Sequence, residues 1–476
     1  MNPQSPEILF DIIYCMAKIN WKELYPKTRE LLRRTFKKYA VFVLHLTPHQ
    51  NIAQTILMYM ILGFFVLSLP FMTRGGVSWL DNLFTSAAAV STAGLATVNF
   101  ADSYTLLGKI VVLILIQIGG VGYMTFTSFL FLSLAKKHRL RKSQTEALSA
   151  EIKLPNTLQL SDFLWAAVVF TIIIESIGAV FFFNYFRHHD FGILQALWYS
   201  VFHSVSSFCT AGFSLWNDSL IGFADSKTMN TVVSCLSLFG AMGFIVAADI
   251  FNFIRRKTNE ISFTTKTIVI VTFLLVASGT FTLFITSPGL SLWEAFFQSV
   301  AAITTTGFYS VDISTLSSCS LLILILMMCI GGSPSGTAGG FKTTAFASAL
   351  ALVYNRLRMN PHVEFLGRRI PMMRLYEATS SILLYTVSLF ISVFLLSWTE
   401  KLSFLDLVFE SAAALSTSGL STGITAQLSF LGKFIIIGTM LIGRIGVITF
   451  GMALLAHDDD HEEENDKPVL PTDIAV

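Results

Sequence analysis

At the end of four short apolar segments in this chain of 476 residues, a threonine stands two residues before a glycine. The four pairs are Thr92 and Gly94, Thr210 and Gly212, Thr305 and Gly307, and Thr417 and Gly419. Glycine adopts backbone angles closed to other residues and adds no side chain, so carbonyl oxygens can turn toward a shared axis. Rings of carbonyl oxygens can replace the hydration shell of an alkali cation. These Thr-x-Gly turns therefore predict binding of a monovalent cation by main-chain groups.

The four pairs belong to a longer internal repeat. In every copy a Phe stands ten residues before the glycine and a Ser stands eight residues before it. These residues are Phe84, Phe202, Phe297 and Phe409, and Ser86, Ser204, Ser299 and Ser411. One isolated Thr-x-Gly is better explained by close packing of membrane helices, but four copies in register are not expected by chance. The repeat therefore favours a shared functional element.

Long apolar segments flank each copy. The chain is 53% hydrophobic and only 13% charged, which excludes an ordinary soluble domain. Eight stretches have the length of a membrane span: 51–72, 106–135, 162–186, 229–254, 266–287, 320–351, 378–397 and 429–456. The segment before each glycine has about ten to twelve residues, which is typical of a re-entrant half-helix. We therefore predict an all-α integral membrane protein of four pseudo-repeated helix–re-entrant pore loop–helix units, with eight full spans around a central pore.

The distribution of charge predicts the orientation. Four segments, 18–38, 136–142, 255–257 and 356–374, hold 21 of the 32 basic residues. Cytoplasmic connections carry the Lys and Arg excess, so both termini are expected in the cytoplasm and the chain in a bacterial-type plasma membrane. The net charge of +2 does not favour a nucleic-acid partner. The predicted parts are a basic N-terminus (1–50), pore units 51–140, 141–258, 259–355 and 356–456, and an acidic tail (457–476).

This fourfold pattern resembles the superfamily of potassium transporters that includes the Trk, Ktr and plant HKT proteins, over about residues 50–456. The resemblance implies that the four Thr and Gly pairs form a selectivity filter that binds K⁺ through backbone carbonyls. None of the four loops has the longer TVGYG sequence of potassium channels. A first span near residue 51 and a total of eight spans are closest to the Ktr type of membrane subunit.

A Ktr-type subunit implies particular partners. These are potassium as the transported ion, membrane lipid, a second copy of the chain in a homodimer, and a cytosolic RCK-type regulatory ring that binds ATP/ADP or NAD. No cofactor is expected in this chain, and sodium as an activator stays open.

A glycine-rich loop interrupts the second helix of the third unit. Residues 331–340 contain five glycines and one proline, which cannot hold a regular helix. A phosphate-binding loop is not favoured, because Phe341 separates the last glycine from Lys342. The resemblance implies a gate beneath the filter that moves. The predicted gating residues of this segment are Gly331, Gly332, Ser333, Gly336, Gly339, Gly340 and Lys342.

Arg444 is the other predicted gating residue. It replaces the second glycine of the Ile-Gly-Gly-Val-Gly pattern that begins at Ile118, and it lies inside an apolar span. A charge within the membrane is costly and needs a partner or a wet cavity. Arg444 could donate to carbonyls of the glycine-rich loop, form an electrostatic barrier near the pore, or be satisfied structurally by a neighbouring helix.

Five further polar residues have open roles. Glu175 and Asp249 are expected to pair or to cap helices, whereas His203, Gln298 and Glu410 stand nine residues before their glycines, as does Thr85 in the first copy. Among other classes, an alternating-access secondary transporter also contains broken helices, but its repeats are inverted. A receptor gives no reason for four such loops. An enzyme is least favoured, because no nucleophile–base pair stands out.

Overall fold

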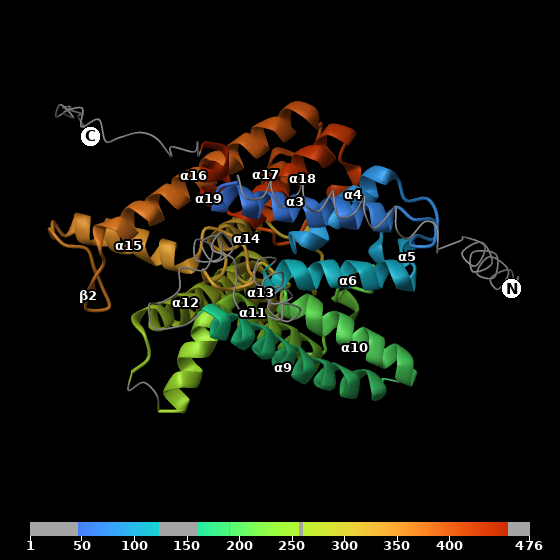
Figure 1. Ribbon diagram of the computed structural model, residues 1–476, viewed down its shortest axis with the longest axis horizontal. Coiled ribbons are helices and arrows are strands. Elements are labelled where there is room, and N and C mark those ends of the chain that lie inside the picture. The colour runs from blue at the N-terminus through green and yellow to red at the C-terminus, as the bar shows by residue number, and fades with distance from the viewer. Residues whose placement is uncertain (1–45, 123–159, 190, 257–259, 456–476) are drawn as a thin grey trace, which may run out of the picture. The chain divides into compact units, whose positions relative to one another are not determined.

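The computed structural model describes residues 46–122, 160–189, 191–256 and 260–455, which are coloured in Figure 1. Within these ranges the chain is helical apart from a single two-stranded hairpin, β1 (Glu364–Phe365) and β2 (Arg368–Arg369). The all-α prediction is confirmed for the described residues. The basic segments 18–38 and 136–142 and the acidic tail lie outside them.

Each predicted unit contains several helices. The first two units contain α3 (Pro48–Leu67), α4 (Trp79–Val90), α5 (Phe100–Ser103), α6 (Leu106–Val121), α9 (Leu160–Arg187), α10 (Ile193–Phe208), η1 (Ile221–Phe223) and α11 (Lys227–Ile254). The last two contain α12 (Phe263–Thr286), α13 (Leu292–Ile303), η2 (Ile313–Thr315), α14 (Ser318–Ile330), α15 (Thr343–Leu357), α16 (Met372–Thr399), α17 (Phe404–Leu415), η3 (Thr425–Gln427), α18 (Phe430–Ile445) and α19 (Val447–Leu455).

Fewer long spans are found than the eight that the sequence predicts. Among the described residues, five helices are long and apolar enough to cross a membrane, namely α3, α9, α11, α12 and α16. The predicted span 429–456 contains α18 and α19, which are bent by 96° at a break, and it counts as a sixth span if this bent pair is one span. Gly446 makes this break with φ 88° and ψ 130°, angles that glycine tolerates. The predicted span 106–135 continues beyond residue 122, outside the described ranges.

The second helix of every predicted unit has a glycine at positive φ, at Gly122 (91°), Gly243 (82°), Gly331 (64°) and Gly446 (88°). Gly122, Gly331 and Gly446 end their helices, whereas Gly243 kinks α11. Only the break in the third unit, between α14 and α15, is predicted above.

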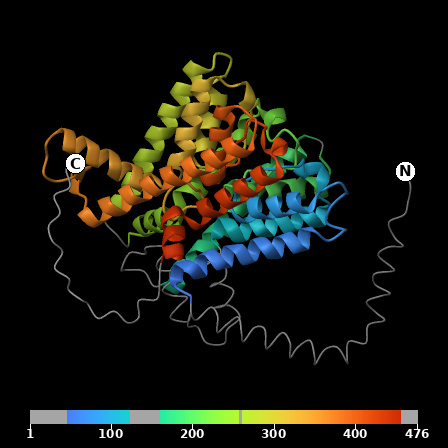
Figure 2. The ribbon, with the colours of Figure 1, turned by 90° about the horizontal axis from the view of Figure 1, so that it is seen from above.

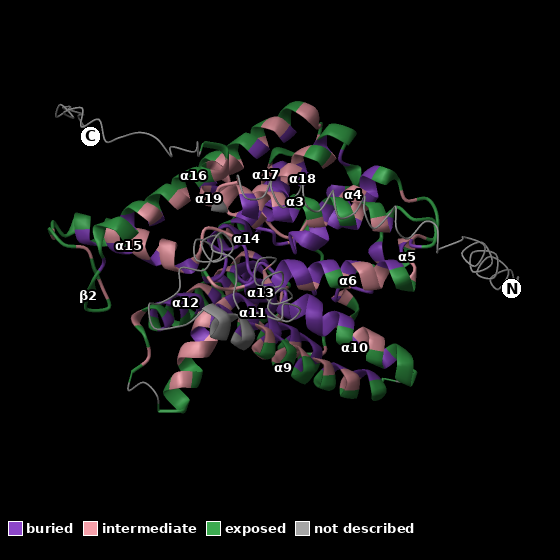
Figure 3. Ribbon diagram, viewed as in Figure 1, coloured by how far each residue is buried: buried purple, intermediate pink, exposed green. Residues whose placement is uncertain are grey.

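The C-terminal parts of the half-helices α4, α10, α13 and α17 are buried, and purple ribbon gathers toward the middle of Figure 3. The repeat phenylalanines Phe84, Phe202, Phe297 and Phe409 are at most 1% exposed. Large apolar side chains on α12 and α16, such as Phe273 and Phe390, are instead 70% exposed. An apolar outer surface around a buried centre of short helices is the arrangement expected in a bilayer.

The first and fourth units lie side by side, as blue α3 and red α19 show in Figure 2. Gln50 Nε2 of α3 donates to the carbonyl of Ala453 in α19 at 3.3 Å. An ion pair of 2.7 Å joins Lys433 of α18 to Asp81 of α4. The contacts between these units bring the first Thr-x-Gly turn next to the last.

Candidate cation pathway

All four half-helices end in the same backbone conformation. In the first, Thr92 N–H donates to Ala89 O at 3.1 Å and Ala93 N–H donates to Ala88 O at 2.8 Å. The same pair of bonds recurs in the other three copies. This is the pattern of a Schellman motif, whose left-handed position glycine usually occupies.

Threonine occupies that left-handed position in every copy. The φ values are 54° for Thr92, 52° for Thr210, 50° for Thr305 and 53° for Thr417. A β-branched residue at positive φ is an outlier that costs about 1–3 kcal/mol and clusters at functional sites. The packing around each turn must therefore hold the threonine in place.

The four turns close into a ring through their glycines. Each glycine packs against the carbonyl that directly precedes the glycine of the next unit. A Cβ added to the glycine would lie only 2.0–2.3 Å from that carbonyl oxygen. The four pairs are Gly94 with Ala211 O (2.3 Å), Gly212 with Thr306 O (2.3 Å), Gly307 with Ser418 O (2.0 Å) and Gly419 with Ala93 O (2.3 Å). No side chain fits at these distances. The last contact returns to the first unit, so the order of the units around the ring is the order of the chain.

Serines of the repeat attach the half-helices to the first helix of their unit. Ser86 donates to Met60 O at 2.7 Å, and equivalent bonds join Ser204 to Glu175 O at 2.6 Å and Ser299 to Val276 O at 3.0 Å. Ser411 is the exception, since its buried hydroxyl has no hydrogen-bond partner among the described residues. Three of the four copies are therefore held in the same way.

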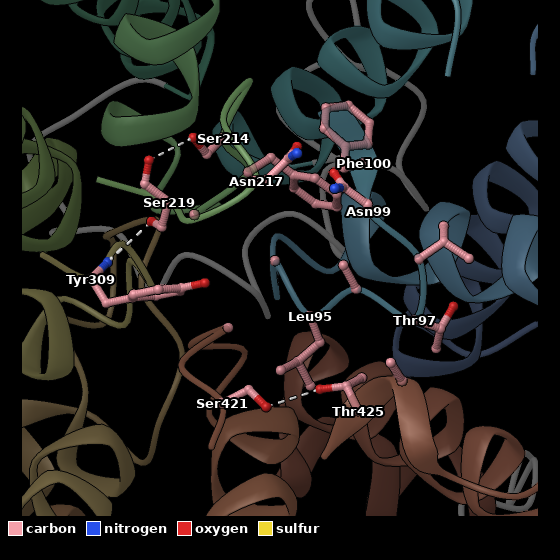
Figure 4. Close-up of a pocket in the computed structure, with 18 of the residues that line it drawn as sticks. Leu95, Thr97, Asn99, Phe100, Ser214, Asn217, Ser219, Tyr309, Ser421 and Thr425 are labelled. Carbon is pink, nitrogen blue, oxygen red and sulfur yellow. Dashed lines mark hydrogen bonds between the residues drawn. The ribbon is translucent and has the colours of Figure 1, made fainter. Parts of the chain in front are cut away.

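A cavity of about 310 Å³ adjoins the ring on the side of the loops that follow the glycines. We call it the mouth cavity, and Figure 4 shows the residues that line it. Its polar side chains include Thr97, Asn99, Asn217, Tyr309, Ser421 and Thr425. Burial raises the pKa of Tyr309, and Asp218 and Asp312 raise it further, so this phenol is neutral at physiological pH. No Asp, Glu, Lys or Arg is among the described residues that line the cavity.

The glycine-rich loop (331–340) contacts the ring on the side of its threonines. Gly339 N–H donates to Thr305 Oγ1 at 2.9 Å, and Thr210 Oγ1 donates to Thr337 Oγ1 at 3.1 Å. A Cβ on Gly339 would lie 2.6 Å from Thr417 Oγ1. Three of the four repeat threonines therefore touch this loop directly.

Arg444 connects the fourth threonine to the same loop. Its Nη1 donates to Thr92 Oγ1 at 3.1 Å and to Thr337 O at 3.0 Å. Its Nη2 donates to the carbonyl of Gly119. Of the three roles predicted for Arg444, the contact with loop carbonyls is therefore present. These bonds also satisfy the guanidinium structurally.

The kink of α11 holds the loop from another side. Ser333 N–H donates to Ala241 O at 2.9 Å, and Ser333 Oγ donates to Met242 O at 2.6 Å. Thr337 N–H donates to Gly240 O at 3.0 Å. The loop is thus fixed by a set of backbone bonds to the second unit.

The predicted gating residues Gly331, Gly340 and Lys342 hold the two ends of the loop together. Lys342 Nζ donates to Ala338 O at 2.6 Å, and Phe341 N–H donates to Cys329 O at 3.0 Å. A Cβ on Gly331 would meet Gly339 O at 2.0 Å, and a Cβ on Gly340 would lie 2.8 Å from Gly331 Cα. Glycine at these positions allows the two ends of the loop to touch.

Other polar residues from the sequence have structural partners. Glu175 accepts from Gln117 Nε2 at 3.3 Å, and Asp249 accepts from the N–H of Ser262, the N-cap of α12, at 2.8 Å. Thr337, which contacts Thr210 and Arg444, is not among the residues predicted from the sequence. Its position inside the glycine-rich loop is the feature of the sequence that could have identified it as a contact residue. The described residues contain no group of three or more His, Cys, Asp or Glu side chains that could hold a metal ion.

Comparisons with known proteins identify a family. Residues 47–463 match the TrkH family, described as cation transport protein. The Ktr system potassium uptake protein B of Vibrio alginolyticus is 34% identical over 402 residues, which cover 82% of this chain and 87% of that protein. The potassium/sodium uptake protein NtpJ of Enterococcus hirae is 35% identical over 430 residues, covering 86% and 93%.

A solved structure shares the fold. The potassium transporter TrkH from Vibrio parahaemolyticus matches with a TM-score of 0.65 and 20% identity, over 84% of this chain and 83% of that one. The predicted resemblance to the Trk, Ktr and HKT superfamily is therefore confirmed. This chain belongs to the TrkH family of cation transport proteins.

Proposed function

We propose that this protein takes up potassium through a selective pore, as the membrane subunit of a Ktr-type system. The observation that carries the proposal is the closed ring of four Thr-x-Gly turns, each contributed by a different unit. Carbonyl oxygens of these turns bind dehydrated K⁺ on the ring axis. The half-helices point their partly negative C-terminal ends at the same place, which favours a cation.

The glycine-rich loop is the gate of this pore. Its contacts with three repeat threonines, and with the fourth through Arg444, support this role. Arg444 holds the loop in the closed position by bridging Thr92 and the Thr337 carbonyl. Opening requires that the loop leave the axis, which breaks these bonds.

The mouth cavity faces the outside of the cell, and both termini face the cytoplasm. The basic segments 255–257 and 356–374 support this orientation, because Lys and Arg are enriched on the cytoplasmic side. The protein works as a homodimer on a cytosolic RCK-type ring that binds ATP/ADP or NAD, as the resemblance to the Ktr type implies. Relatives named as proteins of a Ktr system support only its being one component of such a system. The exposed arginines Arg358, Arg368 and Arg369 beside the β hairpin are available for that ring.

An alternating-access transporter is the alternative. Its inverted repeats would place half-helices in two opposite orientations. Here the four half-helices end in the same motif and meet in one ring, which favours a pore.

The test is potassium uptake into proteoliposomes that contain the purified chain, with sodium present or absent. We expect uptake that follows the potassium gradient and is lost in Gly94→Asp, because that side chain would meet Ala211 O and add a charge at the ring. Equal uptake by the folded variant would contradict the proposed path. If neither protein transports, the regulatory ring is added before the result is judged.

A further inference from the structure

The residue nine positions before each repeat glycine lies buried behind the mouth cavity. These residues are Thr85, His203, Gln298 and Glu410, with exposed fractions of 3%, 0%, 1% and 0%. His203 Nε2 accepts from Leu215 N–H at 3.3 Å, and Gln298 Nε2 donates to Ser310 Oγ at 3.4 Å. The position thus supports the loop after the glycine. Only the fourth copy places a carboxyl group there.

Glu410 binds two hydroxyl groups of the fourth loop. Its Oε2 accepts from Ser421 Oγ at 2.8 Å, and its Oε1 accepts from Thr425 Oγ1. Both hydroxyl residues line the mouth cavity, and Figure 4 shows the contact between them. In the part of the chain that the structure describes, no Lys or Arg forms an ion pair with Glu410. The carboxyl group is therefore separated from the cavity by one layer of hydroxyls.

The direction of these bonds makes the hydroxyl oxygens suitable for a cation. A hydroxyl that donates its hydrogen to a carboxylate keeps its oxygen lone pairs for another partner. Ser421 Oγ already accepts from Gly423 N–H at 3.0 Å, so Thr425 Oγ1 has the greater free capacity. When Glu410 is ionised, its charge is weakly screened in this poorly solvated position, so it attracts cations into the cavity, and a cation there in turn favours the ionised form.

We propose that Glu410 is a positioning residue that, through Thr425 and Ser421, makes the fourth side of the mouth cavity the entry subsite for a partly hydrated monovalent cation. The subsite lies before the ring of glycines and uses side-chain hydroxyls, unlike the ring itself. This inference rests on the proposed cation uptake, and it names a group that raises the affinity of the protein for the cation.

The experiment measures the KM and maximal rate of Rb⁺ uptake in proteoliposomes for the wild type and three variants. Glu410→Gln removes the charge with little change of shape, and Thr425→Val removes the hydroxyl while the residue stays β-branched. Asp406→Asn is the matched control, because Asp406 is a carboxylate in the first turn of the same half-helix and its negative charge repels that of Glu410. We expect Glu410→Gln and Thr425→Val to raise KM about three- to tenfold with a maximal rate within about twofold, whereas Asp406→Asn should not raise KM.

Two further readouts separate positioning from a general structural role. The increase in KM of Glu410→Gln should shrink when an impermeant organic cation raises the ionic strength, because screening weakens the attraction in the wild type. Combining both substitutions should raise KM no further than one alone, since both act on the same subsite.

The outcomes are distinct. An unchanged KM in both Glu410→Gln and Thr425→Val overturns the inference, and so does an equal increase in Asp406→Asn. If Glu410→Gln does not fold, Thr425→Val decides alone by the same criterion. A folded wild type that takes up no Rb⁺, with its regulatory ring present, contradicts the proposed function itself.

Discussion

At the Thr-x-Gly turns the four repeats have nearly the same geometry, whereas at the breaks of their second helices the third repeat differs from the others. In the other three, a glycine three residues before the break packs against the last turn of a half-helix. A Cβ there would meet a carbonyl at 2.3 Å for Gly119, 2.0 Å for Gly240 and 2.1 Å for Gly443. The third repeat has Met328 at this position, followed by the glycine-rich loop.

In the proposed pore, the difference follows from what each region does. A cation on an axis is bound best when every unit offers oxygens in the same geometry, so the turns keep four copies of one strained conformation. A gate needs only one movable segment. The third repeat supplies this segment, and Arg444 of the fourth and the kink of the second hold it.

The largest effect is expected at the turns. Gly307→Ala should abolish potassium uptake, because its Cβ would meet Ser418 O at 2.0 Å and its φ is 81°. Gly76→Ala is the control, since Gly76 also has positive φ (78°) but no atom within 4 Å of an added Cβ. Uptake by both variants in proteoliposomes tests the comparison. Loss in the control alone would contradict it.

Shortening the glycine-rich loop 331–340 to a few glycines should raise the flux severalfold. The change removes the contacts with Thr210 and Thr305 that place the loop under the ring. Potassium uptake is compared per folded protein, judged by size-exclusion chromatography. An unchanged or lower flux would count against the loop as the gate.

Arg444→Ala should raise the flux by a smaller factor, because it removes the bridge between Thr92 and the Thr337 carbonyl but leaves the bonds to α11. Arg444→Lys is the control, because it keeps the positive charge but loses the bidentate hydrogen-bond donor of the guanidinium group. If the bridge between Thr92 and the Thr337 carbonyl holds the loop, the flux of Arg444→Lys should equal that of Arg444→Ala. If the charge is an electrostatic barrier, lysine should behave as wild type, and a wild-type rate in Arg444→Ala would leave only a structural role.

The smallest effect concerns stability. Ser86→Ala, Ser204→Ala and Ser299→Ala should each lower the free energy of unfolding by about 1 kcal/mol, because each leaves a helix carbonyl without its buried donor. Ser411→Ala should be neutral or slightly stabilising, since its hydroxyl has no partner among the described residues. Thermal unfolding in detergent compares the four. Equal losses at all four sites would show that the fourth repeat is held like the rest.

The sequence predicted the turns better than their surroundings. Phe, Ser, Thr and Gly recur at fixed spacing because each has the same physical task in each copy, such as the bond from Ser204 to Glu175 O. The bend at Gly446 was missed, since an apolar run contains no sign of a backbone angle at a single glycine. The partners of the loop were also missed. The bonds from Ser333 to Ala241 and Met242 join residues about ninety positions apart.

The most direct test of the central claim is the position of a heavy cation in the protein. Crystals grown in Rb⁺ should show anomalous density on the axis of the ring, within coordination distance of carbonyls from all four Thr-x-Gly turns. The same crystals of Gly307→Ala should lose this density. Density for Rb⁺ outside the ring, with none on its axis in protein that transports potassium, would contradict a path through the four glycines.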